Sequence, residues 1–229
     1  MTSASRPSVS VVIPAWNAVR FLPAALDSVR QQTYGAAEIL VVDDGSTDGT
    51  AEIARRAADV VLLESPQSGP SAARNLAVDR ASGEVVAFLD ADDLWLPEKL
   101  EKQIAALAAE PAAGLCLCQE ICFVEEGKPL PPWARPHLLE PHTGLLSTTI
   151  VRRQALDDIG PFDESMRQAE DLDWFSRAES VGARRIVVEE VLVRKRLHDA
   201  NATAKSDTNR EAMLKMARKA MLRRRGQSP

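Results

Sequence analysis

The sequence has few of the residues on which disulfide-linked, membrane-spanning or histidine-dependent proteins rely. Its three cysteines, Cys116, Cys118 and Cys122, are odd in number and clustered, which argues against a secreted disulfide framework. No apolar run reaches the roughly 18 residues of a membrane span, and the segment 1–8 lacks the apolar core of a secretory signal. Only three histidines occur, which limits histidine-based catalysis. We therefore expect a protein that is made and kept in the cytoplasm.

The cysteine cluster also lacks the partners of a typical structural zinc site. Such a site usually needs four ligands, and no second cysteine or histidine cluster follows. We therefore interpret the cysteines as buried strand thiols in preference to a metal site.

Several nucleotide-binding and hydrolase motifs are missing as well. The chain has no GxGxxG and no GxxxxGK[ST], which argues against a nicotinamide-binding Rossmann enzyme and a P-loop NTPase. It also has no GxSxG or HExxH.

Charge is distributed unevenly along the chain. Residues 194–229 contain 11 Lys or Arg and 3 Asp or Glu, a local charge of +8, so the rest carries −13 of the total of −5. We interpret the basic end as a solvated helix over residues 207–225. Binding to anionic lipid or nucleic acid is the alternative.

The first 110 residues alternate between predicted strands and helices. Continuous apolar, β-branched runs are typical of parallel strands buried on both faces, and stretches of helical periodicity or helix-start signals follow each run. The predicted strands cover residues 9–14, 39–42, 60–63 and 85–89, and the helices cover about 21–29, 50–58, 70–83 and 97–109. This order predicts an α/β fold with a doubly wound, mostly parallel sheet whose ligands lie at the carboxyl ends of the strands. Asn17, which could also cap the first helix, Asp44, Asp90 and Asp92 stand at those ends.

The second half is less regular. It predicts strands at 115–124, 147–151 and, as one or two strands, 185–193, with helices at 153–159 and 168–181. Residues 125–143 form a predicted long loop that contains Trp133; long loops are often functional, and plain disorder is the alternative.

Two acidic groups follow predicted strands. Asp90 and Asp92 end a hydrophobic strand, where carboxylates can bind Mg²⁺ or Mn²⁺ and a diphosphate can complete the metal's coordination. Turn-forming aspartates are the alternative. After an earlier strand, we expect Asp44 to contact a nucleotide base or ribose and Asp48 to cap a helix.

Glu170 and Asp171 begin a predicted helix that also carries Trp174. A carboxylate there is favoured in its ionised form, which a general base requires. Ordinary acidity at a helix N-terminus is the alternative.

Four linked segments resemble family 2 glycosyltransferases with the GT-A fold. They are SVVIPAWN, ILVVDDGSTDGT, the stretch from GPSAARN to LDADDLWLPEKL, and FDESMRQAEDLDWFSRA. The resemblance covers residues from about 9 to 200 in the family's order. It implies one GT-A-like domain over 1–229, with a donor half (1–110), a smaller acceptor half (111–205) and a basic C-terminal helix and tail (206–229).

The resemblance also implies roles for individual residues. The donor nucleotide sugar would be bound by Pro14, Ala15, Asn17, Asp44, Arg74 and Asp90. The metal would be bound by Asp92 and His198, and the catalytic base would be Asp171. The acceptor side would contain Glu170 and Trp174.

The expected activity is metal-assisted, inverting transfer of a sugar from a nucleoside-diphosphate donor, UDP- or dTDP-linked, to a hydroxyl acceptor. The divalent ion, Mn²⁺ or Mg²⁺, would act as a Lewis acid. The acceptor could be a lipid carrier, a glycan, a peptide or a small molecule. The basic end of the chain would make at most weak contact with the inner face of the membrane. A nucleotidyltransferase that makes sugar nucleotides and an inactive transferase-fold binding module are the alternatives.

Overall fold

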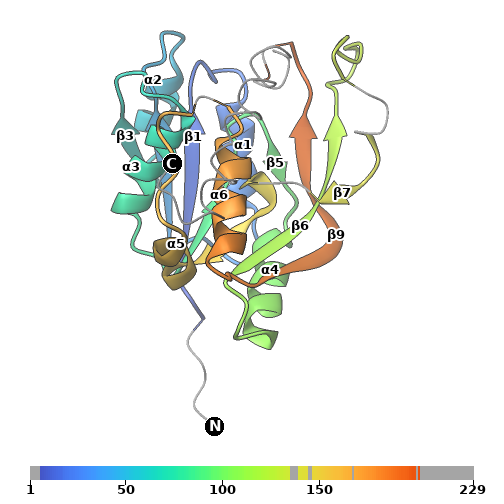
Figure 1. Ribbon diagram of the computed structural model, residues 1–229. Coiled ribbons are helices and arrows are strands. Elements are labelled where there is room, and N and C mark those ends of the chain that lie inside the picture. The colour runs from blue at the N-terminus through green and yellow to red at the C-terminus, as the bar shows by residue number, and fades with distance from the viewer. Residues whose placement is uncertain (1–5, 135–138, 144–145, 167, 200, 202–229) are drawn as a thin grey trace.

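The computed structural model describes residues 6–134, 139–143, 146–166, 168–199 and 201. It is a twisted sheet between two layers of helices (Figure 1). The elements in chain order are β1 (Val9–Ala15), α1 (Leu22–Arg30), β2 (Glu38–Asp43), α2 (Thr50–Arg56), β3 (Val60–Glu64), α3 (Pro70–Arg80), β4 (Val85–Phe88), β5 (Leu94–Trp95), α4 (Lys99–Ala109), β6 (Leu115–Phe123), β7 (His142–Thr143), the 3₁₀ turn η2 (Leu146–Thr148), β8 (Ile150–Arg152), α5 (Arg153–Ile159), α6 (Glu170–Ser180) and β9 (Arg185–Arg196).

The first four strands form the parallel part of the sheet. The strand order is β3-β2-β1-β4-β8-β6-β9-β5, with β7 paired to β6. Neighbours among β1 to β4 run parallel, and Val11, Val12 and Leu40 have no exposed surface. Burial on both faces is the reason β1, β2 and β4 read as unbroken apolar runs, whereas β3 at the edge of the sheet is partly exposed. The predicted α/β fold with a mostly parallel sheet is confirmed.

Helices cover both faces of the sheet. The side chains of α1, α2 and α4 pack with Val11, Ile13 and Val41 on one face. Those of α3, α5 and α6 pack with Val12 and Leu40 on the other, the layer nearer the viewer in Figure 1. The polar residues that follow the strands therefore lie at the strand ends, between the two helix layers.

The second half joins the same sheet with mixed strand directions. β8 is antiparallel to both β4 and β6, β9 is parallel to β6, and β5 is antiparallel to β9. The sequence pattern missed β5, and it placed β7 inside the predicted loop. β9 is one strand that continues to Arg196, so Arg194 to Arg196 belong to the sheet and not to the basic C-terminal segment. The predicted helix at 207–225 lies outside the described residues.

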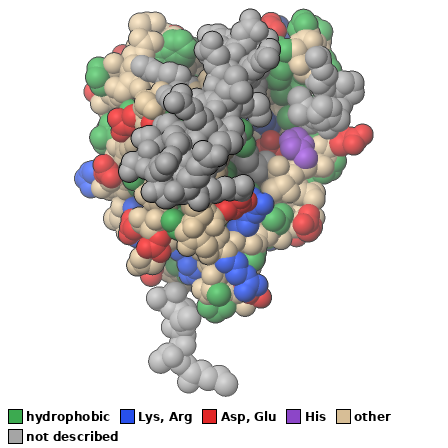
Figure 2. Space-filling view, viewed as in Figure 1, with side chains coloured by type: hydrophobic (Ala, Val, Ile, Leu, Met, Phe, Trp, Pro, Cys, Tyr) green, Lys and Arg blue, Asp and Glu red, His purple; other side chains and the backbone are tan. Residues whose placement is uncertain are grey.

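Within the described residues, all three cysteines are free and buried, as expected of strand thiols. No helix in this part of the chain is long and apolar enough to cross a membrane. On the face seen in Figure 2, acidic and basic side chains lie interspersed.

Candidate donor and acceptor site

Asn17 connects the ends of β1 and β2. Its backbone has a positive φ of 48°, its N–H donates to Ser46 Oγ at 2.9 Å, and its Oδ1 accepts from the Thr47 N–H at 2.9 Å. Pro14 and Ala15 precede it at the end of β1, beside Val42 and Asp43. The prediction that Asn17 caps the first helix is wrong, because α1 begins only at Leu22 and the side chain of Asn17 is bonded to the neighbouring loop.

Asp44 organises the entry to α3. Its two carboxylate oxygens accept hydrogen bonds from the N–H groups of Ser68 and Gly69, both at 2.7 Å, and the residue is 6% exposed. Each oxygen keeps a lone pair for a further donor. Contact with a nucleotide stays a prediction for this residue.

Asp48 holds the start of α2. Its Oδ1 accepts from the Thr50 N–H at 3.0 Å, and its Oδ2 accepts from the Val19 N–H at 3.1 Å. The prediction that Asp48 caps this helix is wrong in position, because Gly49 is the N-cap residue and Asp48 precedes it, although the Asp48 carboxylate accepts from the first helical N–H.

Arg74 joins the donor half to the acceptor half. This arginine of α3 is 5% exposed; its Nη2 donates to Asp90 Oδ1 at 2.9 Å and its Nη1 to Glu170 Oε1 at 2.7 Å. Its Nε atom is buried and has no hydrogen-bond partner within the described part of the chain. A buried guanidinium with two carboxylates fixes the end of β4 relative to the start of α6.

The same ion pairs set the proton affinities of the acidic residues. Burial alone would raise the pKa of Asp90, but Arg74 and Lys195 outweigh it, so that this pKa is lowered. Burial, together with the charge of Glu170, raises the pKa of Asp171 above its ordinary value. The expectation that the helix N-terminus keeps Asp171 readily ionised is therefore wrong, because burial and the neighbouring carboxylate act in the opposite sense.

Asp92 and His198 lie together although 106 residues separate them. The His198 Nε2 is 3.0 Å from Asp92 Oδ2, and Asn201 Nδ2 donates to the same oxygen at 3.2 Å. Phe21 stacks on the His198 ring, with centroids 4.6 Å apart. Among the described residues, Asp92 has no ion pair with Lys or Arg. A carboxylate and an imidazole at this separation fit two ligands of one divalent cation.

Sequence reasoning gave no role to Asp93 and Asn201. Asp93 is 1% exposed and accepts hydrogen bonds from Ser147 Oγ at 2.9 Å and the Arg196 N–H at 3.0 Å. Burial and the neighbouring acidic groups raise its pKa to about 8. The signal for Asp93 was its place in LDADD. Asn201 gave no signal, because its contact with Asp92 depends on the loop after β9.

Trp174 is a core residue. It has no exposed surface, stacks on Phe162 with centroids 5.3 Å apart, and donates from Nε1 to the Gly160 carbonyl at 3.1 Å. Its predicted place on the acceptor side is wrong, because the helical period of α6 turns it toward the sheet. Glu170, predicted on the same side, is 9% exposed and paired with Arg74.

Comparison with known proteins identifies the family. The model of "Glycosyl transferase family 2" matches residues 10–162, which contain the ends of β1, β2 and β4 described above. The chain belongs to this family. The match ends before α6, which carries Asp171, and before His198, which follows β9.

Individual relatives resemble the chain over a larger part of its length. Glycosyltransferase AglE of Haloferax volcanii is 30% identical over 196 residues, covering 80% of this chain and 64% of its own. Mannosyltransferase PcManGT from Pyrobaculum calidifontis, in complex with GDP-Man and Mn²⁺, is 26% identical with a TM-score of 0.74, covering 99% of this chain and 67% of its own.

TarS 1-349 of S. aureus, in complex with UDP-GlcNAc, is 25% identical with a TM-score of 0.72, covering 94% of this chain and 66% of its own. The GT-A-type fold of this chain is thus shown. The chain spans about half to two-thirds of the length of the first curated relatives it matches.

Proposed function

We propose that this chain transfers a sugar from a nucleoside-diphosphate donor, UDP- or dTDP-linked, to a hydroxyl acceptor with inversion at the anomeric carbon. The main support is the Arg74-centred contact between Asp90 and Glu170, which brings Asp171 near the end of β4. Solved neighbours that bind UDP-GlcNAc and GDP-Man add support for the donor class.

Asp92 and His198 are the proposed holders of a divalent ion, Mn²⁺ or Mg²⁺, together with the donor diphosphate. Their ligand atoms lie 3.0 Å apart. When bound, the ion offsets the charge that develops on the departing nucleoside diphosphate. Pro14, Ala15, Asn17 and Asp44 are proposed to line the nucleotide pocket.

Asp171 is the proposed base that takes the proton of the acceptor hydroxyl. Its raised pKa brings it nearer to neutral pH, where a base is most effective. Arg74 limits that rise and holds Asp90 for a hydroxyl of the ribose or donor sugar. Attack from the face opposite the leaving group inverts the anomeric carbon.

The acceptor is proposed as a hydroxyl-bearing compound reached from the cytoplasm: a lipid carrier, a glycan, a peptide or a small metabolite. Weak peripheral membrane contact is proposed for the basic segment 206–229, which lies outside the described residues.

Donor binding tests the proposal directly. Thermal shifts with UDP-, dTDP- and GDP-sugars, with and without Mn²⁺, should show metal-dependent stabilisation by at least one donor. Asp92→Asn should lose the metal-dependent part of this stabilisation. Asp157→Asn, which changes an exposed residue of α5, should keep it. Absence of binding to every donor with metal present would overturn the proposal. Pyrophosphate release from a nucleoside triphosphate and a sugar phosphate would replace it with nucleotidyl transfer.

A further inference from the structure

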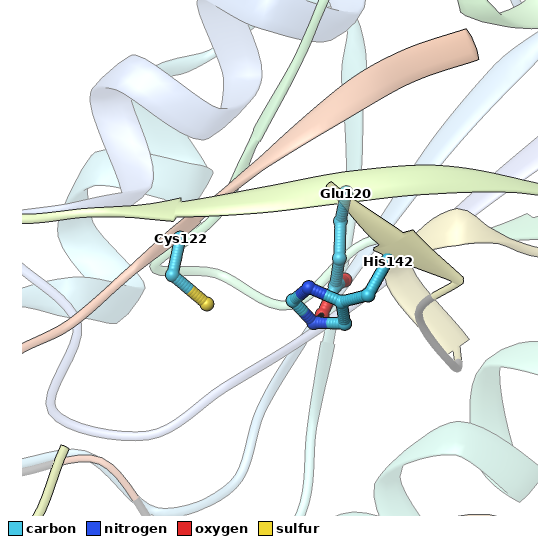
Figure 3. A group of neighbouring side chains, drawn as sticks. All are labelled: Glu120, Cys122 and His142. Atoms are coloured by element: carbon cyan, nitrogen blue, oxygen red, sulfur yellow. Dashed lines mark ion pairs between the residues drawn. The ribbon is translucent and has the colours of Figure 1, made fainter. Parts of the chain in front are cut away.

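A second cluster of metal-ligating side chains lies on β6 and β7. Glu120 and Cys122 are two residues apart on β6, and His142 is opposite Glu120 in the β6–β7 pairing. Figure 3 shows the His142 ring beside the Glu120 carboxylate, with the Cys122 sulfur turned toward them. One ligand atom from each residue lies within 4.8 Å of the others. Within the described residues, this is the only group of three such side chains at this spacing.

The orientation of the His142 ring places its Nε2 atom against the Glu120 carboxylate. The Nδ1 atom is 2.9 Å from the Glu140 carbonyl, which can only accept, so Nδ1 carries a proton. In a neutral ring, Nε2 then presents a lone pair, and this atom is 3.2 Å from Glu120 Oε1. Two lone pairs at this distance repel unless a proton or a metal ion lies between them.

Two features favour a metal ion over a proton. A histidine ligand commonly donates its other ring N–H to a backbone carbonyl, as His142 does to Glu140. Two ligands of a tetrahedral zinc ion at about 2.0–2.1 Å lie about 3.3 Å apart, which matches the separation of the Glu120 and His142 atoms. The cysteine adds a third ligand on the same side of the strand.

The ligand chemistry selects the metal. Imidazole, thiolate and carboxylate together suit Zn²⁺, whereas Mg²⁺ and Mn²⁺ prefer oxygen. The charges of a carboxylate and a thiolate balance a divalent cation. The Lys195 ammonium lies 3.6 Å from Asp93.

We propose that Glu120, Cys122 and His142 form a zinc site separate from the Asp92–His198 pair, so that Cys122 is a metal ligand and not only the buried thiol expected from the sequence. Glu120 and Cys122 are about 5% and 4% exposed, while the His142 side chain is 35% exposed, so a fourth position faces solvent. The ion would fasten β7, which pairs with β6 through only two residues, to the acceptor half. This inference does not depend on the proposed sugar transfer.

Zinc affinity tests the site without any measurement of transfer. The chelator-treated full chain is titrated with Zn²⁺ against a chromophoric chelator, and with Co²⁺ to detect a thiolate-to-cobalt charge-transfer band. Loss of an outer partner alone costs ~10–100-fold in affinity, so Cys122→Ser and His142→Ala should each weaken zinc binding by at least about a hundredfold. Both should abolish or strongly reduce the charge-transfer band.

Two variants serve as controls. Cys118→Ala keeps the same number of thiols as Cys122→Ser and should retain zinc. Asp92→Asn should retain zinc while losing metal-dependent donor binding. Far-ultraviolet circular dichroism checks that each variant folds. If Cys122→Ser fails to fold, His142→Ala still tests the site, because His142 is only half-buried. Zinc binding equal in wild type, Cys122→Ser and His142→Ala would overturn the proposal. Absence of zinc binding in the wild type would overturn it as well, because a second proton on His142 would then account for its contact with Glu120.

Discussion

Contacts within the donor half and contacts between the two halves differ in range. In the donor half, β1 pairs with β2 and β2 with β3, which are neighbours in the chain, and β1 also pairs with β4. Between the halves, β5 of the donor half pairs with β9 of the acceptor half, joining Leu94 to Arg194. The candidate site lies where the two kinds of structure meet, because Asp92 follows β4 and His198 follows β9.

The halves also use polar side chains differently. Asp44 and Asp48 of the donor half are bonded to backbone N–H groups and hold loops in place. The acceptor half supplies Glu170 and His198, which contact charged residues from the donor half. The donor half thus uses these carboxylates to hold its own loops, whereas the acceptor half places side chains against charged residues of the donor half.

Asp171→Asn tests the largest contribution of the acceptor half. Loss of the proposed base should lower kcat by about a thousandfold, about 4 kcal/mol in transition-state free energy, without changing donor affinity. Donor titration calorimetry and initial rates would measure the two effects. Glu179→Gln, at the exposed end of α6, is the matched control. Loss of donor binding in Asp171→Asn would instead assign this residue to the donor pocket.

Arg74→Met tests the connection between the halves. Removing a buried guanidinium leaves Asp90 and Glu170 without their cation, so the free energy of unfolding should fall by about 3 kcal/mol. Urea denaturation at pH 7 measures this change. The double variant Arg74→Met/Glu170→Gln should recover part of the loss, because one buried charge is removed. Equal losses in the two variants would show that Arg74 stabilises by packing alone.

Lys99→Met tests the buried boundary between α4 and β6. Lys99 has no exposed surface, and its Nζ lies 4.1 Å from the Trp95 ring centroid and 2.7 Å from Gln103 Oε1. Burial lowers its pKa from 10.5 to about 8. The substitution should therefore raise the free energy of unfolding by about 2 kcal/mol at pH 7, after allowance for the lost contacts.

The sign of the pH dependence follows from that lowered pKa. Below about pH 8, Lys99 is protonated in both folded and unfolded chains, and the full cost of burying the charge remains. Above pH 8 the folded chain loses the proton first, so the cost declines toward pH 10.5. Denaturation of wild type and Lys99→Met at pH 7 and pH 10 should show a gain that shrinks with pH. Lys128→Met, at an exposed position, should show no such trend, and a gain independent of pH would refute the assignment.

Ala169→Gly tests the smallest difference between the halves. The helices α3 and α6 both follow a residue with positive φ, Gly69 at 96° and Ala169 at 57°. Because alanine is strained in this conformation, Ala169→Gly should raise the free energy of unfolding by about 0.5 kcal/mol after its own entropic cost. Gly69→Ala should have the opposite sign in the same denaturation experiment. Destabilisation by both changes would show that Ala169 is not strained.

The sequence predicted the donor half well and the acceptor half in part. Runs such as residues 9–14 and 39–42 carry their own signal, because a strand buried on both faces must be apolar throughout. β5 has only two residues and β7 two, which is too short for any period to appear. The helix over 153–159 was predicted with its observed bounds, since Gly160 and Pro161 end it.

By itself, the sequence determined the α/β alternation, the acidic strand ends and the resemblance to a glycosyltransferase family. Periodicity and turn residues act locally and are readable in one dimension. Only the tertiary structure decided that Trp174 is buried, that burial raises the pKa of Asp171, and that Asp92 contacts His198 and Asn201. Such properties depend on desolvation and on contacts between residues distant in the chain, and these exist only once the two halves have packed together.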